Sequence, residues 1–157
     1  MPRMMFVCAL VIGCSTQAPT SANATGPELS GDSPAAVATR QSSGKEYSIA
    51  VQLAATQVKS GDPTAVTITI TPQAPWVLKT TTPMKIQLEC TDGCDITKAR
   101  LSAKDIDDAE ASAKSVKTQL KASSGKHRLD GDLSFFLCTD EICKRQTDDL
   151  TLSFDAI

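Results

Sequence analysis

The cysteines are the residues of this chain whose type and spacing could do chemistry, and four of the six lie in two close pairs. Cys90 and Cys94 enclose Thr-Asp-Gly, and Cys138 and Cys143 enclose Thr-Asp-Glu-Ile. Four thiols allow three disulfide connectivities, and the sequence leaves all three open. Pairing within each close pair is the geometrically easiest, because each pair brackets a turn-like segment where Cβ atoms can approach to about 4 Å.

Close cysteine pairs support three kinds of chemistry. A disulfide across about five residues contributes roughly 2 kcal/mol and one across about 50 residues roughly 4 kcal/mol, so a local bridge is a modest structural clip. A bridge that is exposed or strained is more readily reduced, which would permit thiol–disulfide exchange. Four thiolates would alternatively suit tetrahedral zinc. We favour the clip, because the acidic residues Asp92, Asp140 and Glu141 disfavour a reactive thiolate.

The other titratable residues form no recognisable catalytic set. His127 is the single histidine and lies between Lys126 and Arg128, so we expect it to be a solvated turn residue and not part of a triad. The acidic run 105–110 lacks the glycine and the spacing of a calcium loop and is expected to be a solvated face. The sequence therefore indicates no cofactor and, apart from the thiols, no metal ligands.

The composition favours a single exported domain. A chain of 157 residues has room for one domain of ordinary size. The formal net charge of −2 provides no strong field that would favour nucleic acid as a partner. Six cysteines are many for a cytosolic protein of this length, so an oxidising compartment is expected. Because only 4% of residues are aromatic against 41% hydrophobic, the core must be mainly aliphatic.

Residues 1–13 have the pattern of a signal peptide. Arg3 precedes a short apolar run over residues 4–12. That run is far shorter than the roughly 20 residues that a membrane-spanning helix needs. A cleavable export signal is therefore the better interpretation of this segment.

The end of this segment, Val-Ile-Gly-Cys at residues 11–14, resembles a bacterial lipobox. The resemblance implies cleavage after Gly13, loss of Cys8 with the signal peptide, and lipidation of Cys14. Several acyl chains together would hold the protein firmly on a membrane. Ser15, directly after the lipidated cysteine, implies the periplasmic side of the outer membrane.

Residues 14–45 are expected to be the lipidated cysteine followed by a flexible linker. Ser, Thr, Ala, Gly and Pro dominate this range, and it has no aromatic residue. Such a segment cannot bury enough apolar area to offset its chain entropy. The folded domain is therefore expected to cover residues 46–157.

The domain is expected to be all-β, because its apolar residues alternate with polar ones in one segment after another. Gly, Ser, Asp and Pro clusters separate these segments, as in short turns. A helical turn is expected near residues 104–108, and a hairpin turn at residues 123–125. The expected strands cover residues 47–53, 66–71, 84–89, 96–101, 113–122, 127–138 and 150–154.

About seven short strands in about 110 residues predict an immunoglobulin-like antiparallel β-sandwich. The pattern that marks true antibody domains is missing, because Trp76 precedes Cys90 and no cysteine pair has the inter-sheet spacing. The prediction therefore concerns the architecture and not antibody ancestry.

The run Leu-Ser-Phe-Phe-Leu-Cys-Thr-Asp-Glu-Ile-Cys at residues 133–143 is similar to a motif of immunoglobulin-like domains of the DsbD N-terminal type. Residues 75–79 and 82–86 resemble the aromatic, extended segment and the Pro-containing strand of that family. The resemblance covers about residues 47–157. It implies that Cys138 and Cys143 would be the pair that passes electrons to periplasmic partners.

The sequence thus predicts a membrane-anchored periplasmic lipoprotein whose domain is a binding or structural module. The alternative is thiol–disulfide exchange at Cys138 and Cys143, with a periplasmic redox protein as partner. A weaker alternative is a zinc or copper carrier that uses the four thiols.

Overall fold

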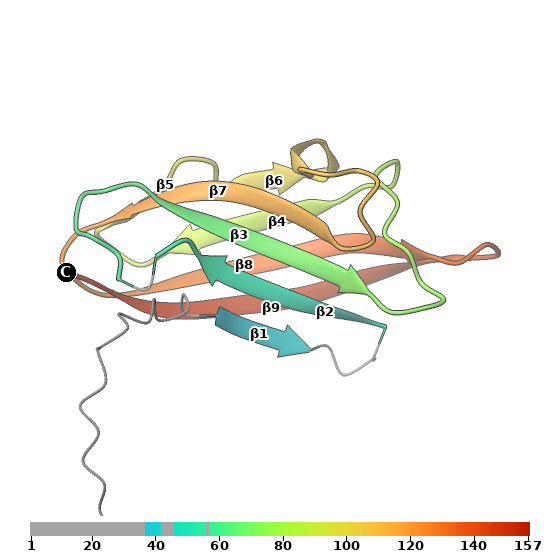
Figure 1. The fold of residues 1–157 in the computed structure, drawn as a ribbon, viewed down its shortest axis with the longest axis horizontal. Helices are drawn as coiled ribbons and strands as arrows, with labels where there is room; N and C mark the ends of the chain where they lie inside the picture. Colours follow the sequence, from blue (N-terminus) through green and yellow to red (C-terminus); the bar gives the residue numbers. More distant parts are fainter. Residues whose placement is uncertain (1–36, 42–45, 56) are drawn as a thin grey trace, which may run out of the picture. The chain divides into compact units, whose positions relative to one another are not determined.

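The chain folds into two antiparallel sheets, as seen in a computed structural model that describes residues 37–41, 46–55 and 57–157 (Figure 1). The first sheet has the strand order β1-β2-β3-β7-β5, and the second has the order β6-β4-β8-β9. The strands are β1 Val37–Gln41, β2 Tyr47–Leu53, β3 Thr64–Pro72, β4 Lys85–Cys90, β5 Cys94–Ile96, β6 Arg100–Ser102, β7 Lys114–Ala122, β8 Gly125–Cys138 and β9 Cys143–Ala156. The predicted immunoglobulin-like sandwich is confirmed, with nine strands in the described residues instead of about seven.

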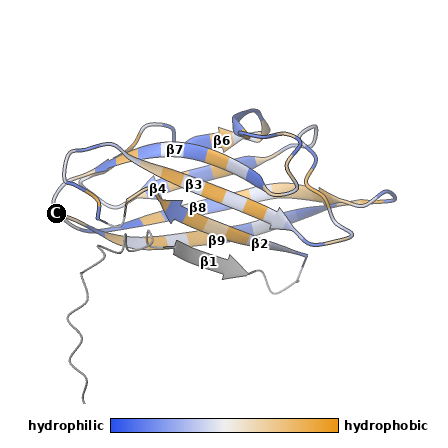
Figure 2. Cartoon of the chain, viewed as in Figure 1, coloured by the Kyte–Doolittle hydropathy of each residue, from blue (hydrophilic) through white to orange (hydrophobic). Residues whose placement is uncertain are grey.

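The core lies between the two sheets and is built from alternate residues of each strand. Ile49, Val51 and Leu53 of β2 are buried and face Ile68 and Ile70 of β3 across the ladder or diagonally. This alternation is visible along the strands in Figure 2, where apolar and polar residues succeed one another. Because a strand turns successive side chains to opposite faces, the period of two in the sequence was sufficient to specify which face is buried.

The single strand predicted over residues 96–101 is wrong. The chain forms β5 in the first sheet and β6 in the second, and it changes sheet between them. Ile96 and Leu101 both face the core, yet five positions separate them, so on one straight strand they would point to opposite faces. The hydroxyl of Thr118 donates to the Lys98 carbonyl at 3.0 Å and accepts from the Lys98 N–H at 3.3 Å, which satisfies the backbone at the crossing.

The hairpin predicted between the strands at 113–122 and 127–138 is also wrong. Strand β7 already has β3 and β5 as neighbours, so β8 pairs with β4 and β9 in the other sheet. The segment between β7 and β8 is therefore a connection from one sheet to the other. The helical turn expected near residues 104–108 is present as a short 3-10 helix, η1 Ala103–Asp105.

Strands β8 and β9 form the long hairpin of the second sheet, drawn in orange and red in Figure 1. Their register runs from Gly125 opposite Ala156 to Cys138 opposite Cys143. The turn expected between Cys138 and Cys143 is therefore present, but the strand expected over residues 150–154 already begins at Cys143, and the two cysteines occupy the last paired positions before the turn.

Strand β1 lies within residues 14–45, the range that was expected to be a linker, and it pairs with β2. The remainder of that range, with Cys14, lies outside the described residues, as do residues 1–13, which the sequence predicts to be a signal peptide. Over the part of the chain that the structure describes, no helix has the length and hydropathy to cross a membrane.

Candidate functional site

The disulfide between Cys138 and Cys143 closes the tip of the β8–β9 hairpin. The two Cα atoms are 4.0 Å apart. Cys138 is fully buried, whereas Cys143 is exposed. In the turn, the Thr139 N–H donates to the Ile142 carbonyl at 2.8 Å. The bridge therefore presents one of its two residues to solvent, whereas the other is fully covered.

The segment between β3 and β4 runs beside Cys138, the buried half of this bridge. The main chains of Val77 and Cys138 form an antiparallel bridge. The Lys144 amine lies 4.7 Å from the centre of the Trp76 ring, in cation–π range, and 3.2 Å from a Glu46 carboxylate oxygen. These contacts tie the extended segment at residues 76–78 to the hairpin tip.

The second disulfide joins Cys90 to Cys94, with Cα atoms 5.7 Å apart. Its turn is docked on the segment between β7 and β8, where the Ser123 N–H donates to the Gly93 carbonyl at 2.8 Å. The Thr91 N–H donates to the Arg128 carbonyl at 3.0 Å, and the Thr91 hydroxyl accepts from the Arg128 N–H at 3.1 Å. Both close pairs are thus bridged locally, which selects one of the three connectivities left open by the sequence.

His127 is buried, so the prediction that it is a solvated turn residue is wrong. The residue is 6% exposed, and its ring stacks on that of Phe154, with ring centres 5.6 Å apart. Nε2 donates to the Ser123 carbonyl at 2.7 Å, while the buried Nδ1 has no hydrogen-bond partner in the described part of the chain. Every second residue of β8 is buried, and His127 shares this phase with Leu129. That alternation was the pattern in the sequence that indicated burial of His127.

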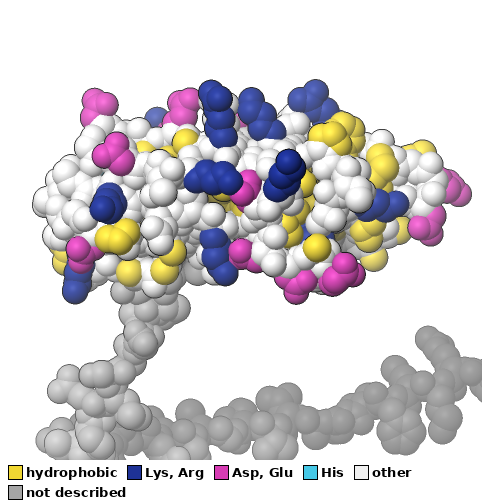
Figure 3. Space-filling model, turned by 90° about the horizontal axis from the view of Figure 1, so that it is seen from above, with side chains coloured by type: hydrophobic (Ala, Val, Ile, Leu, Met, Phe, Trp, Pro, Cys, Tyr) yellow, Lys and Arg dark blue, Asp and Glu magenta, His cyan; other side chains and the backbone are white. Residues whose placement is uncertain are grey.

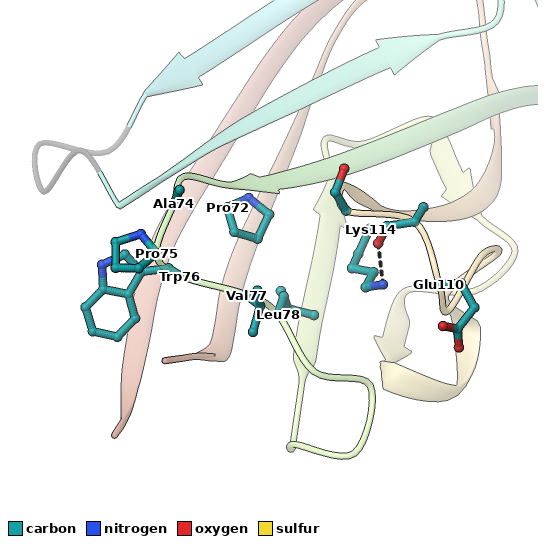
Figure 4. A pocket seen from close by; sticks show the side chains of 10 residues that line it. Pro72, Ala74, Pro75, Trp76, Val77, Leu78, Glu110 and Lys114 are labelled. Atoms are coloured by element: carbon teal, nitrogen blue, oxygen red, sulfur yellow. Dashed lines mark hydrogen bonds between the residues drawn. The ribbon is translucent and has the colours of Figure 1, made fainter. Parts of the chain in front are cut away.

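A groove of about 430 Å³ lies between the segment Pro72–Leu78 and the loop that leads into β7 (Figure 4). Its walls are mainly apolar, and Trp76 lines one side. Small-ligand pockets typically have volumes of about 300–1,000 Å³ and mostly apolar walls. The residues that line the groove are Pro72, Ala74, Pro75, Trp76, Val77, Leu78, Glu110, Ala111, Ser112 and Lys114.

Lys114 is a functional candidate that was not predicted from the sequence. It is the first residue of β7 and is buried in the groove, where its amine donates to the carbonyls of Ala109 and Ala111. Lys114 stands in phase with Val116 and Leu120, which face the core. That phase was readable in the sequence, although a lysine in such a position ordinarily marks the outer face.

The acidic run contributes an ordered contact and no metal site. Asp105 accepts from the Lys98 amine, and its other carboxylate oxygen accepts from the Ser102 N–H at 2.8 Å. The Lys98 bond and then the Ser102 bond hold the pKa of Asp105 below its usual value of 3.8. No group of three or more His, Cys, Asp or Glu side chains in the described residues is arranged to hold a metal ion.

Charged side chains of both signs occur on the face of the molecule seen in Figure 3. Exposed ion pairs include Lys117 with Asp107 at 2.9 Å and Arg128 with Asp130 at 2.8 Å. Such pairs are typical of a solvated surface, where each contributes little to stability.

Comparisons with known proteins assign no family to this chain. No protein-family model matches it, and no curated protein matches it. Among solved structures it is similar to the GAE domain of GGA2p from Saccharomyces cerevisiae (9% identity, TM-score 0.43, 74% of this chain and 97% of that one). It is also similar to the N-terminal periplasmic domain of ScsB from Proteus mirabilis (13% identity, TM-score 0.43, 77% of this chain and 51% of that one). At these sequence identities and TM-scores, the similarity does not indicate a function for this chain.

Proposed function

We propose that this chain is an exported lipoprotein, anchored to a membrane through Cys14, whose β-sandwich acts as a binding module. The observation that carries the binding role is the preformed groove beside Trp76, with its apolar walls and the buried amine of Lys114. A concave apolar site with few polar groups is the usual form of a ligand site.

The anchoring part of the proposal rests on the sequence Val-Ile-Gly-Cys at residues 11–14. The two disulfides support export, because such bridges persist in oxidising compartments and are rare in the cytosol. Ser15 favours the outer membrane over the inner one.

Metabolic labelling with radioactive palmitate tests the anchor. We expect incorporation into the wild-type chain and none into Cys14→Ala, while Cys8→Ala keeps the label. Cys8 is the matched control, because the lipobox places it inside the removed peptide. Wild-type protein without label, or equal labelling of the Cys14→Ala chain, would remove the anchor from the account.

Site-specific photo-crosslinking in cells tests the binding role. A photoreactive residue at Val77, which is 48% exposed at the groove, should give a discrete adduct identified by its mass. The same residue at Thr151, exposed on β9 and absent from the groove lining, is the control. Adducts of equal yield at both positions, or none at Val77, would contradict a binding function of the groove.

Thiol–disulfide exchange at Cys138 and Cys143 is the second candidate, favoured by the exposure of Cys143. A partner thiolate would attack the Cys143 sulfur, form a mixed disulfide, and release Cys138 as a thiolate. In the reverse direction the reduced pair would donate two electrons to a partner disulfide and become oxidised itself. The zinc or copper alternative would first require reduction of both bridges, because their sulfurs are paired in the structure.

Equilibration of the protein with glutathione buffers, followed by counting of free thiols, separates a clip from an exchange site. The midpoint reduction potential of a structural clip lies below about −300 mV, whereas that of an exchange pair lies at about −200 mV. The binding-module proposal predicts the first result for both bridges. A midpoint near the second value for Cys138–Cys143 alone would favour the exchange function.

A further inference from the structure

Lys114 carries a buried positive charge that the described residues do not neutralise. The residue is only 7% exposed. The amine donates to two backbone carbonyls, and no carboxylate in the described residues lies within ion-pair distance of it. Buried charges in proteins are ordinarily paired, because the desolvation of an isolated ammonium is costly. The lack of a carboxylate partner among the described residues is therefore the feature of Lys114 that needs an explanation.

The surroundings of the amine define which anion would fit. An ammonium has three donors, and two of them are used by the carbonyls of Ala109 and Ala111. The donor that remains can bind one oxygen of a singly charged group. Glu110, an exposed residue of the groove wall, would repel a second negative charge. In the view of Figure 4 the Lys114 amine lies between Leu78 and Glu110.

The remaining walls fit an apolar body. Pro72, Pro75, Trp76, Val77 and Leu78 come from one continuous segment and line the same groove of about 430 Å³. We propose that the groove binds a small amphipathic carboxylate, with the carboxylate on the Lys114 amine and the apolar body along this segment. This inference rests on the proposed binding function and names the ligand class of that site.

The single tryptophan of the chain is Trp76, so its fluorescence reports directly on the groove. The full chain carrying Cys14→Ala, which has no lipid, is titrated with decanoate, decanol and decyltrimethylammonium below their micellar concentrations. We expect decanoate to bind at least about tenfold more tightly than decanol, because a charge-assisted hydrogen bond is among the strong ones. The cationic probe should leave the fluorescence unchanged.

Lys114→Met, which keeps the apolar stem and removes the charge, should abolish the preference for decanoate over decanol. Lys121→Met, at an exposed position of the same strand, is the matched control and should keep it. Glu110→Gln gives an independent readout if Lys114→Met fails to fold. It should tighten decanoate and leave decanol unchanged.

The outcomes separate this inference from the proposed function. Equal affinity for decanoate and decanol would overturn the carboxylate class while leaving a groove that binds ligands. No response to any probe, together with specific crosslinks at Val77, would overturn the inference and keep the binding function for another partner. A loss of the preference in Lys121→Met equal to that in Lys114→Met would also overturn it.

Discussion

The main chains of Val77 and Cys138 exchange two hydrogen bonds, each with an N–O distance of 2.9 Å. Through this pair, the segment that forms the apolar wall of the groove is fastened to the buried half of the hairpin disulfide. The groove and the bridge are therefore neighbours that share one backbone contact. A change in this contact should therefore affect both the groove and the Cys138–Cys143 bridge.

Val77→Pro removes the N–H of residue 77, one of the two donors in this pair of hydrogen bonds. Its comparison with Val77→Ala separates the effect of the backbone from that of the side chain. We expect a loss of about 1–3 kcal/mol in the free energy of unfolding, because proline lacks the N–H and leaves the Cys138 carbonyl unpaired. Reduction of the Cys138–Cys143 bridge by dithiothreitol should become faster. Val77→Ala keeps both hydrogen bonds and should change neither value by more than about 0.5 kcal/mol or its kinetic equivalent.

Gly131 of β8 lies opposite Leu88 of β4 and Leu150 of β9. A Cβ atom at this position would lie 2.7 Å from Leu88 Cδ2 and 3.0 Å from Leu150 Cγ. Gly131→Ala should therefore destabilise the domain by about 1–3 kcal/mol through overpacking, measured by urea unfolding.

A double-mutant cycle checks that cause. Leu88→Ala removes the closer of the two contacts and leaves the one with Leu150, so Gly131→Ala should cost less in that background. An unchanged cost in both backgrounds would contradict the steric explanation.

The sequence predicted the strands that depend on local alternation of apolar and polar residues. It did not predict which strands pair with one another in the two sheets. Strand β2 was predicted to the residue, because Tyr47 to Leu53 alternate without interruption. The change of sheet between Ile96 and Leu101 was missed, because only the neighbours of each half reveal it. His127 was misassigned because its charged flanking residues outweighed its inward phase on β8.

The candidate site was half predicted. The cysteine pairs were visible from their spacing, although their connectivity was not. The groove was invisible, because its two walls are about 35 positions apart in the sequence and meet only through the fold. Lys114 could have been singled out only by asking which lysine shares a face with Val116 and Leu120.

Asp105 should make stability depend on acid. The pKa of Asp105 in the folded state lies below the usual 3.8. Its contribution to the free energy of unfolding is therefore complete above pH 3.8 and is lost as the pH falls through the folded-state pKa. The partly exposed pair with Lys98 limits the effect to less than about 1 kcal/mol. Urea unfolding between pH 5 and pH 2 should therefore show a shallower loss for Asp105→Asn than for the wild type. Identical slopes would contradict the assignment.

The two cysteines of the hairpin tip should differ in reactivity after partial reduction. Cys143 is exposed and Cys138 is fully buried, so iodoacetamide should label Cys143 first. Peptide mapping by mass spectrometry at short labelling times reads the order directly. Preferential labelling of Cys138 would mean that the segment at residues 76–78 opens before the hairpin does.

The intact mass of the protein extracted from membranes, before and after reduction, tests the central claim of an exported, lipid-anchored domain with two local bridges. We expect a chain that begins at Cys14, carries lipid on that residue, and gains four hydrogen atoms on reduction. A chain that still begins at Met1 without lipid, or a mass that reduction leaves unchanged, would contradict it.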